Sequence, residues 1–389
     1  MKILMLHNDY LSMGGEYLSV REEAEGLSSL GHDVRLETVD NLNIARASPS
    51  QKIRLLLNDR SSEHRVAHAL REFEPDIVHA QNLFPLLGAN AINAMKKSGV
   101  PWVRTLRNYR TRCIAGTCFL AGETCTRCPS AARGLSGVVH KCYQGSRAAS
   151  AGAVAYASRE RTAEHEYPPR AYIVLSRAMR EFITPAAGDA RLVIKPNAVA
   201  PQRSRPMERQ ARDIGVLYAG RFAEEKDVST IVRVAAQLPN VPFTLIGDGP
   251  TLNGIKAASQ RLPNVAILGS LQHDELMETM ARAVVVVVPS AWAEPFGRVA
   301  AEALACGTPA ITSDQGGLPE IVEPVDPMLT VRPESGNTWK TAIERVVRMG
   351  DAEYQDLCLR ALERWRGTYS PAVTARRLYS IYSEAVSSS

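Results

Sequence analysis

Short apolar runs alternate with segments of helical pattern along most of the 389-residue chain. Each run is long enough for one strand, and the segments between them have the length and apolar spacing of helices. Parallel strands need such crossover helices, and a strand that is buried on both faces is apolar throughout. The five-valine run Val284–Val288 is the clearest example, and we predict that it forms a central strand. The alternation therefore predicts an α/β fold with doubly wound parallel sheets.

The alternation occurs twice, once on each side of a polar stretch at residues 197–212, which we interpret as a linker. The expected strands are residues 2–7, 33–39, 76–80, 101–106, 171–176 and 191–197 before the linker, and 214–220, 243–249, 265–270, 283–290 and 309–313 after it. We predict two Rossmann-like domains, residues 1–199 and 200–367, facing each other across a cleft. A C-terminal helix at about 368–389 would be free to pack back onto the first domain.

The composition is ordinary for a globular protein, with 45% hydrophobic and 22% charged residues. No apolar stretch reaches the roughly eighteen residues of a membrane-spanning helix. The N-terminus lacks the pattern of a signal peptide, so we expect a cytoplasmic protein. Residues 1–199 carry 26 Lys and Arg against 19 Asp and Glu. This basic excess could favour an anionic substrate or the inner face of a membrane, or it could be ordinary solvated surface.

Two glutamates flank the start of a predicted helix in the segment EPFGRVAAEALACG. Glu294 precedes the helix and Glu302 lies inside it, with Pro295 expected in the first turn and Gly307 at the C-terminal cap. The helix would separate the two acids by about 12 Å. That spacing is too long for an acid–base pair acting on one bond, but it suits gripping two ends of an elongated ligand. The alternative is that both are solvent-facing helix charges.

Cations and glycines follow other expected strands of the second half. Arg221 and Lys226 come soon after the strand that ends at Gly220, and an arginine fork with a lysine point charge suits a diphosphate. The next strand is followed by a loop whose glycines permit close approach to a ligand, made of Gly247, Asp248, Gly249 and Pro250. Carboxyl ends of parallel strands meet at one edge of a sheet, so these features together predict a sugar-nucleotide site.

The segment at residues 289–322, PSAWAEPFGRVAAEALACGTPAITSDQGGLPEIV, resembles the donor motif of the retaining glycosyltransferase family 4, whose members have the two-Rossmann GT-B fold. The segments GRFAEEK and LIGDGP are similar to that family's other signatures, in the same order and spacing. In the first half, GGE, LGHDV and PDIVHAQNLFPLLG are also similar to it. The resemblance covers most of the chain, and it is most specific in the second half.

The resemblance implies roles for these residues. Arg221 and Lys226 would hold the diphosphate and stabilise its leaving charge. Glu294 would contact the transferred sugar, and Glu302 would take the ribose hydroxyls. The other donor-binding residues that we expect are Gly14, Gly15, Gly220, Gly247, Asp248, Gly249, Pro250, Phe296, Gly297 and Arg298.

The implied reaction moves a hexosyl unit from a UDP- or GDP-linked sugar to a hydroxyl acceptor, with retention at the anomeric carbon. In this family the departing phosphate itself helps to deprotonate the incoming hydroxyl, so charge stabilisation is the main catalytic contribution. The resemblance implies that no catalytic metal is required. It also implies a role in making a bacterial cell-surface polysaccharide, a glycolipid or a glycosylated natural product.

Arg107 departs from the family pattern, which often has a histidine at this place. An arginine can hold a sugar hydroxyl or the carboxylate of an acidic sugar, but it cannot act as a base. We therefore keep Arg107 as a catalytic candidate that would go with a different donor or acceptor, or with an inactive enzyme. His79 and Asn108 are candidates for the acceptor site, although a lone histidine at a strand end is as often structural.

Five of the seven cysteines lie close together in sequence: Cys113, Cys118, Cys125, Cys128 and Cys142. The C-x2-C pair, together with Cys142 and either of the first two, could supply four thiolates to a structural zinc ion, with Cys113 the preferred fourth ligand. The alternative is a set of reduced thiols in a loop. Cys306 and Cys358 are expected in helix cores.

Two other classes of protein compete with the enzyme. A zinc-ribbon nucleic-acid binder would use the basic segment RTLRNYRTR, but that segment is short, so we expect no nucleic acid as a partner. A dehydrogenase is disfavoured because neither first strand is followed by G-x-G-x-x-G. A non-catalytic sugar-nucleotide-binding protein of the same fold stays open from the residues alone.

Overall fold

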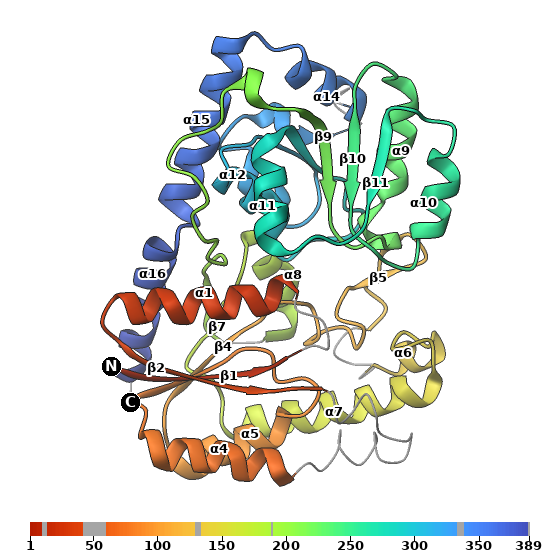
Figure 1. Ribbon diagram of the computed structural model, residues 1–389. Coiled ribbons are helices and arrows are strands. Elements are labelled where there is room, and N and C mark those ends of the chain that lie inside the picture. The colour runs from red at the N-terminus through yellow and green to blue at the C-terminus, as the bar shows by residue number, and fades with distance from the viewer. Residues whose placement is uncertain (10–13, 42–59, 129–133, 188–189, 333–337, 388–389) are drawn as a thin grey trace. The chain divides into compact units, whose positions relative to one another are not determined.

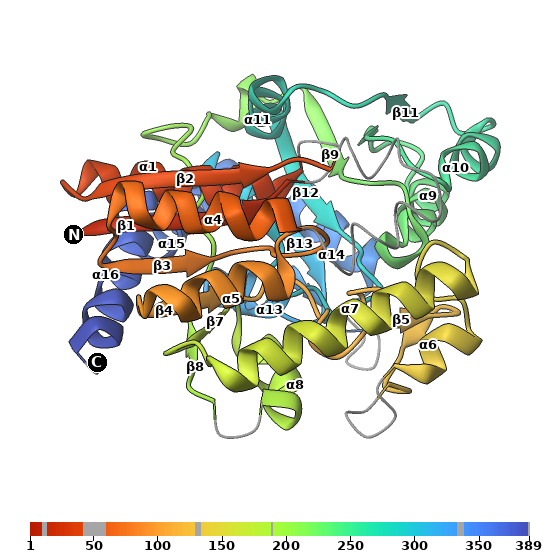
Figure 2. The same ribbon diagram turned by 90° about the horizontal axis from the view of Figure 1, so that it is seen from below.

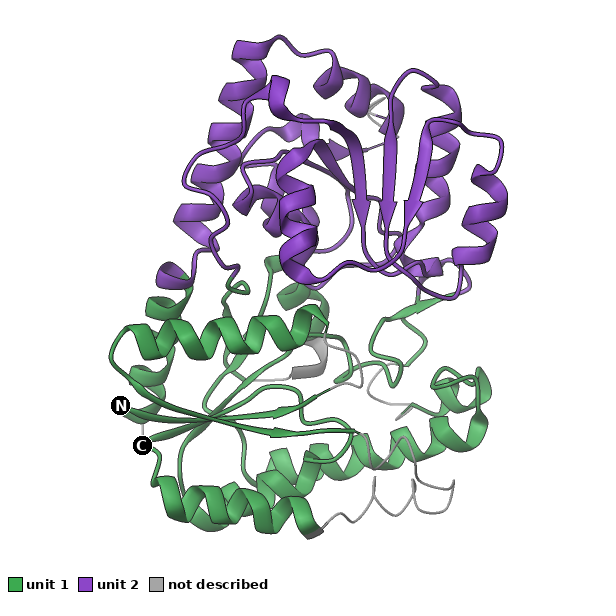
Figure 3. Ribbon diagram, viewed as in Figure 1, with its two compact units in different colours: residues 1–120, 125–198, 374–389 green, residues 121–124, 199–373 purple. Residues whose placement is uncertain are grey.

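Two six-stranded sheets organise the chain, one in each of two units of the computed structural model (Figures 1 and 3). The structure describes residues 1–9, 14–41, 60–128, 134–187, 190–332 and 338–387. Unit 1 comprises Met1–Leu120, Cys125–Ala198 and Thr374–Ser389, and unit 2 comprises Ala121–Thr124 and Val199–Val373. The strand pairings described within each six-stranded sheet are parallel, so the predicted α/β fold is confirmed.

The sheet of unit 1 has the order β2-β1-β3-β4-β7-β8. Its strands are β1 (Lys2–Asn8), β2 (Asp33–Val39), β3 (Ile77–Ala80), β4 (Trp102–Thr105), β7 (Tyr172–Val174) and β8 (Leu192–Ile194). From β1, the chain moves outward to β2 on one side and then to β3 and the later strands on the other. The carboxyl ends of β1 and β3 therefore form a topological switch point, where α/β sheets commonly bind ligands.

Helices cover both faces of this sheet. One face packs against α4 (Arg60–Phe73), α5 (Gly88–Ser98) and α7 (Arg147–Glu166), which lie together in Figure 2. The other face packs against α1 (Gly15–Ser29) and the later part of α16 (Pro371–Ser387). Strand β1 serves both cores because successive side chains point to opposite faces: Leu4 and Leu6 join the first, and Ile3 and Met5 join the second.

The sheet of unit 2 has the order β11-β10-β9-β12-β13-β14. Its strands are β9 (Ile214–Ala219), β10 (Phe243–Ile246), β11 (Val265–Leu268), β12 (Ala283–Val288), β13 (Ala310–Ser313) and β14 (Thr330–Val331). The valine run forms β12 between β9 and β13, which confirms the predicted central strand. The order reverses between β9 and β12, so this unit has its switch point at their carboxyl ends.

The helices of unit 2 form two contacting groups. Helix α9 (Val228–Gln237) contacts α10 (Leu252–Ser259) and α14 (Trp339–Val347), whereas α12 (Arg298–Ala305) contacts α11 (His273–Arg282), α13 (Leu318–Val322) and α15 (Asp351–Thr368). Cys306 and Cys358 are fully buried at these helices, as expected. Among the helices of the described ranges, none has both the length and the apolar character needed to cross a membrane.

Helix α12 begins later than the sequence predicts. We expected Pro295 in its first turn, but Gly297 is the N-cap and Arg298 the first helical residue. Gly297 has a φ of +104°, and a Cβ at this position would lie 2.4 Å from Leu318 Cδ2. The left-handed conformation of Gly297 separates Pro295 from the helix, because a right-handed helix cannot continue through it. The other end follows the prediction, with Gly307 at a φ of +67° after the last turn.

Candidate functional site

The switch point of unit 2 brings the predicted cations next to carboxylates. Arg221 forms an ion pair with Glu225, and its side chain is 61% exposed. Lys226 forms an ion pair with Glu294, and its Nζ lies 5.3 Å from the centre of the Trp292 ring. The exposed guanidinium is therefore accessible to a ligand, whereas the lysine is positioned by a carboxylate and an aromatic face.

Glu294 is buried and held in place through both its side chain and its backbone. Its Oε1 accepts hydrogen bonds from Lys226 Nζ and from Ser290 Oγ, the latter at 2.7 Å. Its carbonyl oxygen accepts from Gly317 N at 2.7 Å, and a Cβ at Gly316 would lie 2.3 Å from that oxygen. The loop after β13 thus needs glycine in order to reach Glu294. The reading of Glu294 as a solvent-facing charge is wrong.

Glu302 is also buried, with 4% of its surface exposed. Its Oε1 accepts from Arg298 Nε at 2.7 Å, one turn earlier on α12. A charged partner is needed here, because a lone carboxylate in the interior would carry a large desolvation cost. Both glutamates of the EPFG segment are therefore fixed groups near the start of α12, and neither is a surface charge.

Two glycines let two loops of unit 2 stack on one another. Phe222 N donates to Asp248 O at 2.8 Å, and Gly220 N donates to Ile246 O at 3.0 Å. A Cβ at Gly247 would lie 1.9 Å from Gly220 O, and one at Gly249 would lie 2.3 Å from Phe222 O. The glycines that we predicted to face a ligand thus also have a packing role between the loops after β9 and β10.

A second polar cluster lies at the carboxyl edge of the sheet in unit 1, and Glu23 of α1 is at its centre. Its carboxylate accepts from Gln81 Nε2 at 3.0 Å, from Arg107 Nη2 at 2.9 Å and from Lys195 Nζ. The side chains of Glu23 and Lys195 are at most 1% exposed. Burial alone would raise the pKa of Glu23, but the adjacent charges of Arg107 and Lys195 outweigh it and hold that pKa well below its usual range.

The hydrogen bonds described for Arg107 all lie within this cluster, and its side chain is only 3% exposed. Nε and Nη2 donate to Gln81 Oε1 at 3.1 and 2.8 Å, Nη2 also reaches Glu23, and Nη1 donates to Asn197 Oδ1. To bind a sugar directly, the guanidinium would have to break these bonds. The structure thus gives Arg107 a positioning role that the sequence did not indicate.

His79 is completely buried and does not line the pocket described below, which agrees with the structural alternative and not with a place lining the acceptor site. Arg107 can only donate, so the atom of Gln81 that faces it is Oε1, and Gln81 Nε2 lies 3.1 Å from His79 Nδ1 and 3.2 Å from His79 Nε2. The imidazole also forms hydrogen bonds with Tyr382 Oη, 2.6 Å from Nδ1, and with Thr105 Oγ1, 2.7 Å from Nε2. Burial lowers the pKa of His79 to about 3.

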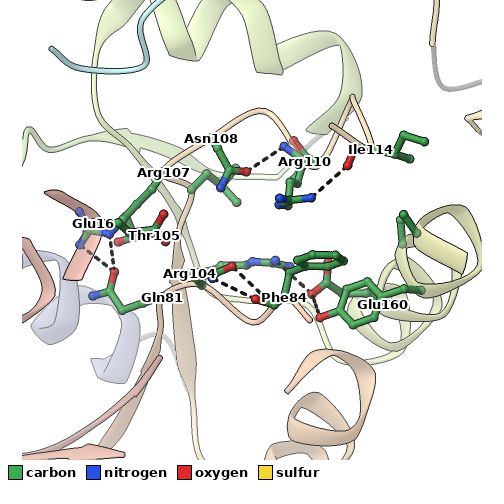
Figure 4. Close-up of a pocket in the computed structure, with 16 residues that line it drawn as sticks. Glu16, Gln81, Phe84, Arg104, Thr105, Arg107, Asn108, Arg110, Ile114 and Glu160 are labelled. Carbon is green, nitrogen blue, oxygen red and sulfur yellow. Dashed lines mark hydrogen bonds and ion pairs between the residues drawn. The ribbon is translucent and has the colours of Figure 1, made fainter. Parts of the chain in front are cut away.

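A pocket opens above this cluster within unit 1 (Figure 4). Its empty space is about 540 Å³ when the open solvent at its mouth is included. Gln81, Thr105 and Arg107 line it from the cluster, and the predicted acceptor residue Asn108 lines it as well. Gly14 caps α1 and Gly15 begins it, which places Glu16 in the pocket wall, where burial raises its pKa.

The cysteine segment does not form the predicted zinc site. In the described parts of the chain, no three His, Cys, Asp or Glu side chains are grouped so that they could hold a metal ion. All seven cysteines are free thiols. Cys113 is distinctive, because hydrogen bonds from the Cys118 thiol and from backbone N–H groups lower its pKa to about 5.

Sequence reasoning missed several residues that complete these clusters. Ser290 and Gly316 hold Glu294, and Lys195 and Tyr382 close the buried network of unit 1. Ser290 is the last residue of one predicted strand and Lys195 lies near the end of another, positions at which a polar residue could have been singled out. Nothing local marks Tyr382, because it lies more than 300 positions from His79.

Comparison with solved structures identifies the fold. Sucrose-phosphate synthase from Thermosynechococcus elongatus is similar over 100% of both chains, with a TM-score of 0.69 and 20% identity. HepE from Anabaena, solved in complex with UDP, is similar over 99% of this chain and 100% of its own, with a TM-score of 0.67 and 17% identity. The chain has the α/β two-domain GT-B fold of glycosyltransferases.

Sequence comparison then identifies the family. The family "Glycosyl transferases group 1" matches residues 202–359, and "Glycosyl transferase 4-like domain" matches residues 14–198. The chain belongs to the group 1 glycosyltransferase family.

Curated relatives match a smaller part of the chain. The D-inositol 3-phosphate glycosyltransferase of Mycobacterium tuberculosis is 31% identical over 44% of this chain and 37% of its own length. The phosphatidylinositol N-acetylglucosaminyltransferase gpi3 subunit of Schizosaccharomyces pombe is 29% identical over 34% of this chain and 31% of its own. The chain thus spans about a third of the length of the curated relatives that it matches.

Proposed function

We propose that the protein transfers a hexosyl unit from a nucleoside-diphosphate sugar to a hydroxyl group of an acceptor, with retention at the anomeric carbon. The observation that carries this proposal is the set of charged groups at the switch point of unit 2. These groups lie in or next to the loops after β9 and β12. They are exposed Arg221, the Lys226–Glu294 pair and the Arg298–Glu302 pair. Family membership and a relative solved with UDP-glucose support a UDP-linked donor.

Arg221 and Lys226 would bind the diphosphate and offset the charge that it gains as it leaves. The bond from the anomeric carbon to the phosphate oxygen breaks, and a bond from that carbon to the acceptor oxygen forms. The acceptor's proton passes to the departing phosphate oxygen. These two cations supply the positive field at the leaving group, so we propose that transfer proceeds without a catalytic metal.

Glu294 and Glu302 would each accept hydroxyl groups of the donor. The hydrogen bonds described for Glu294 both end on Oε1, so Oε2 can accept one from the transferred sugar. Glu302 would accept from the ribose hydroxyls. The loop glycines let backbone N–H groups approach the nucleotide closely. Two of the curated relatives are named for inositol-containing acceptors, and a polyhydroxylated acceptor is our proposal here, in the synthesis of a polysaccharide, glycolipid or glycosylated natural product.

The basic segment of unit 1 does not favour a nucleic-acid partner. Arg104 forms ion pairs with Glu160, at 3.2 Å, and with Glu164. Arg107 is neutralised by Glu23, and both arginine side chains are less than a tenth exposed. A phosphate backbone needs exposed cations, and these two of the segment's four arginines are instead buried and paired with glutamates.

The test separates the nucleotide-binding and transfer roles of the two glutamates. We expect Glu302→Gln to weaken binding of UDP about tenfold in isothermal titration calorimetry, because a charge-assisted hydrogen bond to ribose is lost. Glu294→Gln should leave UDP affinity within about twofold and instead reduce transfer from UDP-sugars. Glu344→Gln, which removes a surface ion pair with Arg348 on α14, is the control.

The same assays decide between the enzyme and a non-catalytic binder of the same fold. Turnover of UDP- and GDP-sugars in the presence of polyol acceptors, with and without a chelator, tests both activity and the metal-free mechanism. Proton NMR of the product reports its anomeric configuration. UDP binding without any turnover would contradict the enzyme, and undiminished UDP affinity of Glu302→Gln would contradict the ribose assignment.

A further inference from the structure

The pocket of unit 1 contains buried polar atoms that no described residue satisfies. Glu16 Oε1, Arg110 Nε and Thr111 Oγ1 have no hydrogen-bond partner within the described residues, and all three residues line the pocket. Buried polar groups are nearly always hydrogen-bonded, so groups left open at the wall of a pocket are the positions where a ligand can contribute the missing partners.

Arg110 is the cation of this wall that has no carboxylate partner in the described chain. Its guanidinium lies 4.1 Å from the centre of the Phe84 ring, and Nη1 donates to Ile114 O at 3.0 Å. Its backbone N donates to Asn108 Oδ1 at 3.0 Å. The aromatic face and the carbonyl oxygen hold the guanidinium in place without neutralising it. The two other arginines of the wall, Arg104 and Arg107, have glutamate partners.

The other end of the pocket has a different chemistry. In Figure 4, Glu16 lies with Thr105 and Gln81, whereas Arg110 lies over Phe84 toward the opposite end. Thr105 Oγ1 lies 2.7 Å from His79 Nε2, and a hydroxyl group has one proton and two lone pairs, so this hydrogen bond leaves Thr105 able to form another with a ligand. Hydroxyl groups of a ligand can therefore donate to Glu16 Oε1 and form a hydrogen bond with Thr105.

From these two ends we infer that the pocket binds a hydroxylated ring that carries an anionic substituent, with the anion at Arg110 and Thr111 and the hydroxyl groups at Glu16 and Thr105. The substituent is an oxyanion such as a phosphate or a carboxylate. This inference rests on the proposed function in one respect: it makes the ligand the acceptor of the transferred sugar. It assigns to Arg110 the selection between charged and neutral acceptors.

The experiment measures binding to the full-length protein by calorimetry, with glucose, glucose 6-phosphate and glucuronate as probes. We expect the two anionic probes to bind at least about tenfold more tightly than glucose, because a charged hydrogen bond to Arg110 is added. Arg110→Gln should abolish this preference and leave UDP affinity unchanged. Thr111→Val, which keeps the side-chain shape, should reduce the preference.

Arg112→Gln is the matched control. Arg112 belongs to the same segment, lies 4.8 Å from the centre of the Phe182 ring and donates to Phe182 O, but it does not line the pocket. The Arg112→Gln variant should retain the full preference for the anionic probes over glucose. Equal binding of charged and neutral probes to the parent protein would overturn the inference, and so would a preference that survives in Arg110→Gln. Anion-selective binding without sugar transfer would instead contradict only the proposed enzyme.

Discussion

Gln81 shows how one side chain can set the chemistry of its neighbours. Its amide oxygen faces the donor groups of Arg107, so its nitrogen must face Glu23 and His79. Gln81 Nε2 lies 3.1 Å from His79 Nδ1 and 3.2 Å from His79 Nε2, and as a donor it requires an unprotonated ring nitrogen to accept from it. The imidazole is therefore held neutral between two cations, Arg107 and Lys195, and one carboxylate.

The neutral state of His79 predicts a loss of stability in mild acid. Its pKa is lowered to about 3 in the folded protein by burial, against 6.5 for an ordinary histidine. Below pH 6.5 the unfolded chain binds a proton that the folded chain excludes, so stability falls as the pH decreases toward 3. The slope is about 1.4 kcal/mol per pH unit for each such histidine. Urea unfolding of unit 1 between pH 6.5 and 5 measures it.

His79→Gln should reduce the slope of stability against pH by about 1.4 kcal/mol per pH unit, because glutamine does not titrate. His68→Gln is the control: His68 is 65% exposed on α4, so water surrounds it in both states. Parallel pH profiles for the parent protein and His79→Gln would contradict the assignment of the neutral imidazole.

Residue types at the candidate site were predictable, but their partners were not. The order of strands placed Arg221, Lys226 and Glu294 at one edge of a sheet. The sequence could not indicate that Lys226 would bind Glu294, or that Arg107 would be enclosed by Glu23 and Gln81. Such pairings depend on side-chain directions and on contacts between residues that are distant in sequence.

At the scale of the elements, the two stacked loops of unit 2 depend on glycine. We expect Gly247→Ala to destabilise unit 2 by about 3 kcal/mol or more, because its φ of +141° is strained for alanine and the new Cβ would overlap Gly220 O. UDP affinity should fall with it. Gly254→Ala is the control: a Cβ there meets nothing within 4 Å in helix α10, and alanine favours a helix by about 0.5–1 kcal/mol.

Chemical denaturation of both variants, followed by calorimetry with UDP, measures this difference. Equal stability of Gly247→Ala and the parent protein would show that the loops can separate without cost.

Most elements could be predicted from periodicity, and the exceptions have physical reasons. Every expected strand forms. Helix α7 was not predicted, because its many alanines and serines give little apolar periodicity, although alanine favours a helix. The late start of α12 was missed because no local pattern indicates the left-handed conformation of Gly297, which packs so closely against Leu318 of another helix that a Cβ would not fit. Short strands such as β14 carry too few residues for a pattern.

At the scale of the whole molecule, the last helix completes the core of unit 1. Leu378, Ile381 and Tyr382 of α16 are buried against the same core as Ile3 and Val20. We expect Leu378→Ala to destabilise unit 1 by about 2–5 kcal/mol, because it opens a cavity in that core. Unit 2, with its own sheet, should keep its stability.

Hydrogen exchange resolved by mass spectrometry tests this prediction. Protection of β1, β3 and α1 should fall in Leu378→Ala, while protection of β9, β10 and β12 stays constant. Ser380→Ala, an exposed position on the same helix, should change neither set. Equal loss of protection in both units would mean that they unfold as one.

Helix α16 has a further consequence for the order in which the chain matures on the ribosome. Tyr382 reaches His79 only after all of residues 199–373 have been translated. Unit 2 is continuous over these residues, so its sheet is complete while unit 1 still lacks the part of its core that α16 supplies. The half of the protein that is made first is therefore the half that finishes folding last.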